Sequence, residues 1–188
     1  MSNGQCAKPP SPWREENGVI FFTLTSNGMT GEKWITYLKT KKTPISPDAI
    51  SYNTEQLLRS PEFKTTDGVT YEVVVLKGKL FKDLERSTEN IDAEAAKRSL
   101  EKPSSLELAF LIYDAFTCKD REAMGLDEII IMSKPFVDSV GSLRLLGAIR
   151  KDYAQWVAAL YGNPARQWYR VTGFAYVSRK PACNTAKA

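Results

Sequence analysis

Residues 143–178 read LRLLGAIRKDYAQWVAALYGNPARQWYRVTGFAYVS, and their pattern of apolar runs is the strongest indication of the fold. Three runs within this stretch are rich in aliphatic and aromatic residues and are typical of β-strands: Leu143–Ile149, Gln155–Tyr161 and Trp168–Ser178. Because only short segments connect these runs, we expect each to pair antiparallel with the next. The run Glu128–Met132 adds one strand before them. The sequence therefore predicts a C-terminal antiparallel meander of four strands.

The turn positions predict which residues of the meander face one another. If residues 151–154 connect the first hairpin, Arg150 faces Gln155 and Leu145 faces Leu160. A slip of one residue would exchange the two faces of a strand, because successive side chains point to opposite sides of a sheet. The register is therefore a hypothesis that a structure can test directly.

Arg170 is the most unusual position of the predicted meander. A second hairpin would place it opposite Gly147 and Ala158, which have the smallest side chains on that face. We expect a concavity there, with the guanidinium at its floor and the indoles of Trp156 and Trp168 at its walls. Such a site would suit a phosphate, a carboxylate or a stacked base. The alternative is that Arg170 pairs with an acid of the helical segment and that both tryptophans belong to the core.

Positive charge is concentrated at the C-terminal end of the chain. From Ser142 to Ala188 there are eight Lys or Arg residues and one acid, a net charge of +7, whereas the preceding residues carry a net charge of −3. A basic surface with interspersed aromatic side chains suits an anionic or planar partner. The alternative is an ordinary solvated rim at strand ends. The candidate binding residues are Arg144, Trp156, Tyr161, Trp168, Tyr169 and Arg170.

Strand and helix signals alternate in the residues before the meander. The run Val69–Lys77 is largely apolar on both faces and predicts a central strand, and Val19–Thr25 predicts another. Helices are expected from the N-cap Thr30 to residue 42, and over 47–59, 80–98 and 105–116, where the polar interruption in 80–98 favours two short helices. The predicted class is α+β, a single domain with helices packed on a mixed sheet. We expect the domain to span residues 18–180, between a flexible lead, 1–17, and a flexible tail, 181–188.

The absence of histidine excludes the largest number of mechanisms. Without it there is no Ser-His-Asp or Cys-His nucleophile, no imidazole base and no histidine-ligated zinc. The three cysteines, Cys6, Cys118 and Cys183, lie far apart, which argues against a disulfide framework and a zinc site. We therefore expect no metal and no cofactor. Because no apolar run is long enough to span a bilayer and the N-terminus is polar, we expect no membrane association and a cytoplasmic location.

Two carboxylates occupy unexpected positions, Glu72 in the central strand and Asp114 in an otherwise apolar helix. Buried together, they would resemble the acid-base pair of a carboxylate-dependent enzyme. The preferred hypothesis is instead a non-catalytic binding or interaction protein that uses its basic, aromatic C-terminal sheet to bind an anionic or protein partner. The alternatives that stay open are a nucleic-acid-binding accessory protein and a small enzyme that works without histidine.

Overall fold

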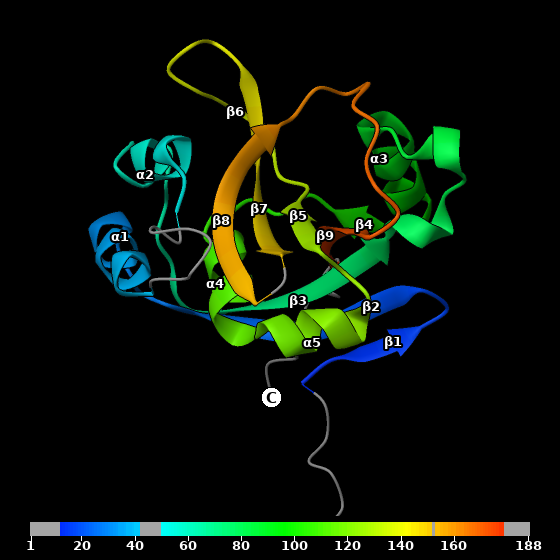
Figure 1. Cartoon of the computed structure of the whole chain (residues 1–188), viewed down its shortest axis with the longest axis horizontal. Coiled ribbons are helices and arrows are strands. Elements are labelled where there is room, and N and C mark those ends of the chain that lie inside the picture. The colour runs from blue at the N-terminus through cyan, green and yellow to red at the C-terminus, as the bar shows by residue number, and fades with distance from the viewer. Residues whose placement is uncertain (1–11, 42–49, 152, 179–188) are drawn as a thin grey trace, which may run out of the picture.

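The computed structural model describes residues 12–41, 50–151 and 153–178. Within them, nine strands form one mixed sheet in the order β1-β2-β3-β9-β5-β7-β6, with β4 paired to β9 and β8 paired to β7 (Figure 1). The strands are β1 Arg14–Glu16, β2 Val19–Asn27, β3 Asp67–Lys77, β4 Leu100–Glu101, β5 Glu128–Ile131, β6 Phe136–Val137, β7 Leu143–Lys151, β8 Ala154–Tyr161 and β9 Thr172–Ser178. The predicted α+β class, with helices packed on a mixed sheet in a single domain, is confirmed.

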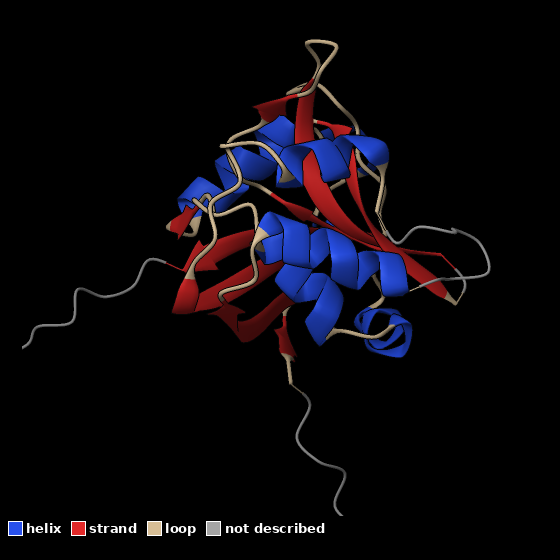
Figure 2. Ribbon diagram, turned by 90° about the vertical axis from the view of Figure 1, so that its left-hand side faces the viewer, coloured by secondary structure: helices blue, strands red, loops and turns tan. Residues whose placement is uncertain are grey.

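Helices cover parts of both faces of this sheet. They are α1 Gly31–Thr40, α2 Tyr52–Leu58, α3 Thr88–Lys97, α4 Leu108–Ala115 and α5 Cys118–Met124, with 3-10 turns η1 Gly78–Leu80 and η2 Asp83–Glu85. One core cluster joins α1, α2 and α4 to one face, and Figure 2 shows helices in front of the strands on the side where α1 and α2 lie. A second cluster joins α3 to the opposite face. The centre of the sheet is therefore buried on both sides.

The helix boundaries follow local signals. Thr30 caps α1 by accepting a hydrogen bond from the backbone nitrogen of Lys33 (3.4 Å). The expected interruption of the segment 80–98 is confirmed, because η1 and η2 precede an α3 that Ser87 caps. The part of the expected helix 47–59 that precedes Ile50 lies outside the described residues, and α2 occupies the remainder.

The β7–β8 hairpin has the predicted register. Arg150 pairs with Gln155 and Leu145 pairs with Leu160, and the eight residue pairs continue without a shift. β5 also pairs antiparallel with β7, as expected of the meander. Cross-strand pairs next to a short connection were thus predictable from the sequence.

The fourth strand of the expected meander is placed differently. β9 begins at Thr172, and it pairs antiparallel with β3 and parallel with β5. Residues 162–171 instead form a long connection toward α3, because the backbone nitrogen of Trp168 donates to the carbonyl of Arg86 (2.9 Å). Gly173 then lets β9 fit between its neighbours, since a Cβ there would lie 2.7 Å from Val75 Cγ1. The expected second hairpin, from β8 into β9, is therefore wrong.

Part of the expected N-terminal lead belongs to the sheet. Arg14–Glu16 is strand β1, which pairs with β2. Glu15 fixes it there by accepting from the Nζ atoms of Lys77 (3.0 Å) and Lys79 (2.9 Å). The rest of the lead up to residue 11, and the expected tail, lie outside the described residues. Among the helices of the described chain, none is both long and apolar enough to cross a membrane.

Candidate functional site

The concavity expected at Arg170 is not formed. A Cβ placed on Gly147 would lie 2.8 Å from Ile130 Cδ1 and 3.1 Å from Leu160 Cδ1, so these aliphatic side chains already occupy the space above the glycine. Arg170 itself is exposed and lies outside the strands, in the connection between β8 and β9. The prediction failed because it assumed that β9 pairs with β8.

The two tryptophans of the predicted site are also separated, because β9 does not pair with β8. Trp168 is only 3% exposed, its Nε1 donates to Thr88 Oγ1 (2.9 Å), and its ring contacts that of Phe174 at 5.9 Å between centroids. The alternative interpretation, in which this residue is core, is therefore correct for Trp168. Trp156 is half-buried on β8, directly opposite Ile149. Neither indole lies beside Arg170 in the sheet.

Arg144 and Tyr161 are brought together, but the arginine has an internal partner. The two residues pair across β7 and β8, with the guanidinium 3.9 Å from the centroid of the tyrosine ring. Arg144 Nε also donates to Asp138 Oδ2 at 2.7 Å. Although burial acts to raise the pKa of Asp138, hydrogen bonds from Ser142, Arg144 and Val140 lower it overall, so this carboxylate is charged and neutralises Arg144.

Other bases of the C-terminal region also have partners inside the fold. Arg150 pairs with Asp127 (2.9 Å) and donates to the carbonyl of Leu126 (3.0 Å). The guanidinium of Arg166 stacks 4.1 Å from the ring centroid of Trp168. Much of the excess positive charge in the sequence of this region is therefore used in structural contacts. Arg170, by contrast, is in no ion pair with any residue that the structure describes.

A close backbone contact determines where Arg170 lies. The connection 162–171 packs against η1 at Gly78, where a Cβ would be 2.5 Å from the carbonyl oxygen of Tyr169 and 3.0 Å from that of Arg170. Only glycine allows this approach, since any side chain would collide with backbone atoms. The contact brings Arg170 close to Lys79. The hydrogen bond to Glu15 raises the pKa of Lys79, and the nearby charge of Arg170 opposes that increase.

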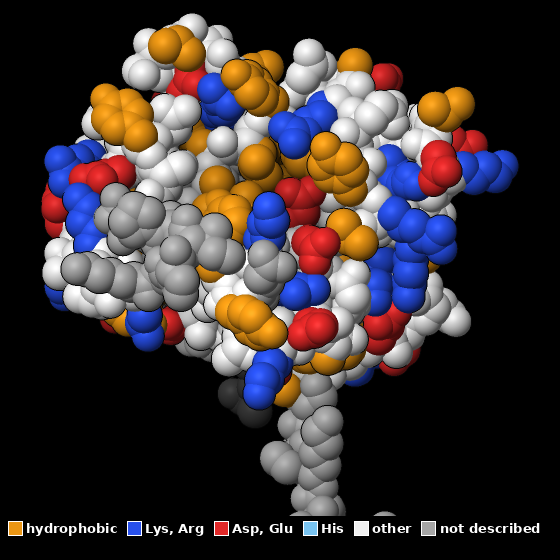
Figure 3. Space-filling view, viewed as in Figure 1, with side chains coloured by type: hydrophobic (Ala, Val, Ile, Leu, Met, Phe, Trp, Pro, Cys, Tyr) orange, Lys and Arg blue, Asp and Glu red, His pale blue; other side chains and the backbone are white. Residues whose placement is uncertain are grey.

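Lys79, Tyr169 and Arg170 therefore form one exposed group, which we call the Arg170 surface. Tyr169 is 68% exposed, and its neighbour Arg170 is exposed as well. Figure 3, viewed as in Figure 1, shows Lys and Arg side chains gathered, with a few acids among them, toward the side on which α3 lies. An exposed guanidinium is able to bind a carboxylate or phosphate, and an exposed aromatic ring is able to bind a planar group.

Glu72 and Asp114 do not form the acid-base pair that a carboxylate-dependent enzyme would need. Glu72 and Asp114 are both exposed, and each is bound by a different group: Glu72 accepts from Ser178 Oγ (2.6 Å), and Asp114 accepts from the Tyr37 hydroxyl. In the described part of the chain, no cluster of three or more Cys, Asp or Glu side chains suits a metal ion. The joint burial of Glu72 and Asp114, on which the enzyme alternative depended, is therefore not found.

Lys79 is the one residue of this surface that was not among the candidate binding residues predicted from the sequence. The only local signal was Gly78, which stands between two lysines directly after the central strand. Its importance depends on the β8–β9 connection, which is distant in sequence. No protein-family model, curated protein or solved structure matches this chain.

Proposed function

We propose that this protein is a non-catalytic binding protein whose Arg170 surface binds an acidic segment of a protein partner. The observation that carries the proposal is the exposed Arg170, which is in no ion pair among the described residues, lies close to Lys79 and directly follows the exposed Tyr169 in the chain. A guanidinium binds a carboxylate through two parallel hydrogen bonds, which gives orientation as well as affinity.

Charge distribution favours an acidic peptide over a nucleic acid. Binding to a phosphate backbone requires several cations at once, because affinity arises from the release of counterions at each neutralised phosphate. Two other cations of the C-terminal region, Arg144 and Arg150, are paired with Asp138 and Asp127. A short acidic segment needs only the few charges that remain exposed.

The test compares retention on two anionic resins. Arg170→Gln should weaken retention on immobilised poly-L-glutamate by roughly two- to fivefold, the effect of one exposed ion pair. Lys151→Gln is the matched control, since it removes one exposed charge from the end of β7, outside the defined surface. Equal effects of the two variants would show that only net charge matters and would overturn the proposal.

The second resin carries single-stranded DNA and tests the alternative that the protein binds nucleic acid. Stronger retention there than on poly-L-glutamate, lost in Arg170→Gln, would indicate nucleic-acid binding and contradict the acidic-peptide proposal. The stability of Arg170→Gln is the internal check, because an exposed side chain outside special features changes it by about 0.5 kcal/mol or less. A loss of about 3–5 kcal/mol would instead reveal a structural ion pair.

A further inference from the structure

One end of the sheet face that α3 covers contains a groove of about 520 Å³. Its floor is Val74 on β3, and one wall is Phe21 on β2, which faces Val74 directly. The opposite wall combines Leu100 on β4 with Ser178 at the end of β9, which pair with each other. The apolar residues come from three strands and Ser178 from a fourth, β9, so the groove depends on the central position of β9.

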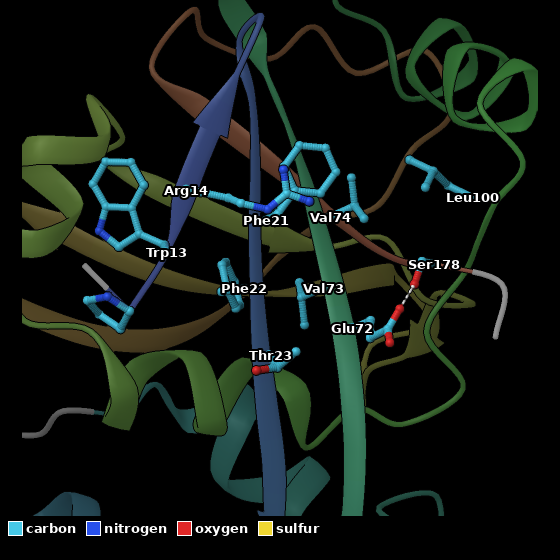
Figure 4. Close-up of a pocket in the computed structure, with 11 residues that line it drawn as sticks. Trp13, Arg14, Phe21, Phe22, Thr23, Glu72, Val73, Val74, Leu100 and Ser178 are labelled. Atoms are coloured by element: carbon cyan, nitrogen blue, oxygen red, sulfur yellow. Dashed lines mark hydrogen bonds between the residues drawn. The ribbon is translucent and has the colours of Figure 1, made fainter. Parts of the chain in front are cut away.

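Two charged side chains stand on opposite walls. The guanidinium of Arg14 lies 4.2 Å from the ring centroid of Phe21 on one side, and Glu72 lies beside Ser178 on the other (Figure 4). β1 and β3 have β2 between them, so these charges are on the order of 10 Å apart. The groove therefore has an apolar centre and one pole of each sign.

The two charged side chains, Arg14 and Glu72, differ in how far their hydrogen-bonding capacity is already used. Arg14 is paired with Glu16 and stacked on Phe21. Glu72 accepts one hydrogen bond, from Ser178 Oγ to Oε2 (2.6 Å), and forms no ion pair with the described residues. An exposed carboxylate with unused acceptor capacity next to apolar surface is suited to a cationic donor.

We propose that this groove binds a small apolar molecule that carries a primary ammonium group. The apolar body lies on Phe21, Val74 and Leu100, and the ammonium donates to Glu72. Because Glu72 lies at one end of the groove, this single charged contact sets the orientation of the ligand. The volume falls within the usual range for small-molecule sites, roughly 300–1,000 Å³.

The hydrogen-bonding state of the strands favours a small molecule over a peptide added to the sheet. At the centre of the groove, Phe21 pairs with Arg14 and Val74, and Val74 also pairs with Tyr176, so neither strand presents a free edge at these two positions. Strand addition needs such an edge. Recognition here depends on apolar contact and one charged contact.

The experiment is an NMR titration of the ¹⁵N-labelled full chain with 2-phenylethylamine. Neutral 2-phenylethanol and anionic 3-phenylpropanoate are the matched probes of similar size. We expect the amine to shift the amide signals of Phe21, Val74 and Leu100 at the lowest concentration, and the anion to bind most weakly. An anion that binds as tightly as the amine would overturn the proposal.

Glu72→Gln is the decisive variant. It should weaken amine binding roughly two- to fivefold and leave the alcohol unchanged, since only the charged contact is lost. Glu89→Gln, an exposed acid at the start of α3, is the control and should change neither. Leu100→Ala should weaken both ligands. Unchanged amine affinity in Glu72→Gln would contradict the proposal, and since Arg170 is not part of the groove, this outcome would leave the proposed function unaffected.

Discussion

The β7–β8 hairpin and strand β9 belong to the same sheet but are held in it in different ways. The strands of the hairpin follow one another in the chain and pair over eight consecutive positions. β9 lies between β3 and β5, neither of which is adjacent to it in sequence. Its residues Phe174, Ala175 and Tyr176 are all buried, in clusters on opposite faces. The register of the hairpin follows from its own turn and cross-strand pairs, whereas the place of β9 between two distant strands depends on what packs above and below it.

The largest effect on stability is expected when a buried side chain is removed from β9. Phe174 is fully buried, with ring centroids 5.9 Å from Trp168 and 6.3 Å from Phe81. Phe174→Ala should lower the free energy of unfolding by about 3–5 kcal/mol, because it leaves a cavity between the sheet and the β8–β9 connection. Urea denaturation measures this change. The control in the hairpin is the half-buried Leu160→Ala, which should lose clearly less, and equal losses would contradict the distinction.

A second substitution tests the connection that leads into β9. Gly78→Ala would place a methyl group 2.5 Å from the carbonyl oxygen of Tyr169, so η1 and the connection must move apart. We expect a loss of about 1–3 kcal/mol in the free energy of unfolding. Retention on poly-L-glutamate should fall too, because the positions of Lys79 and Arg170 depend on this contact.

The exposed Lys82→Ala, in the segment just after η1, provides the comparison for Gly78→Ala. It should change stability by about 0.5 kcal/mol or less. A Gly78→Ala protein with unaltered stability and retention would show that the close backbone contact is not needed for the Arg170 surface.

The smallest expected effect on stability concerns Glu128, which contacts both the β7–β8 hairpin and β9. It pairs with Ile149 of the hairpin and with Thr172 at the start of β9, and it accepts from Thr172 Oγ1 at 2.5 Å. Burial raises the pKa of Glu128 above its ordinary value of 4.5. The folded state therefore favours the protonated acid. The stabilising contribution of Glu128 is fully present below pH 4.5 and is lost as the pH rises through the raised pKa.

Glu128→Gln should therefore stabilise the protein at pH 7 by roughly 1 kcal/mol or less, and this gain should disappear at pH 4. Urea unfolding at the two pH values measures it. Glu62→Gln, which removes an exposed acid, is the control and should give no gain at pH 7. A gain from Glu128→Gln that is the same at both pH values would rule out the ionisation of Glu128 as its cause.

Local features of the fold were predictable from the sequence. Thr30 as a helix cap and the facing of Arg150 and Gln155 both depend on a few neighbouring residues. The neighbours of β9 were not predictable, because an apolar run of β-branched and aromatic residues contains no information about which distant strand it joins. The pairing of β9 with β3 and β5 determines which residues surround Arg170.

The candidate sites illustrate the same limit. Arg170 and Glu72 each stood out in the sequence, as a cation and an acid in unexpected places. Their partners could not be inferred, since Lys79 and Ser178 meet them only after β9 has joined the sheet. Chemical character was therefore predictable for single residues, whereas their combination into a surface or a groove required the topology.

The central place of β9 has a consequence for how the protein is made. Val73 and Val177 face each other in the sheet but are about 100 residues apart in the chain, so their pairing closes a very long loop. Until β9 has joined the sheet, β1-β2-β3 and β5-β7-β8 are two half-sheets with unpaired edges at β3 and β5. Such edges attract other chains. A chain in which β9 is missing or fails to insert therefore keeps both edges unpaired and is prone to aggregate.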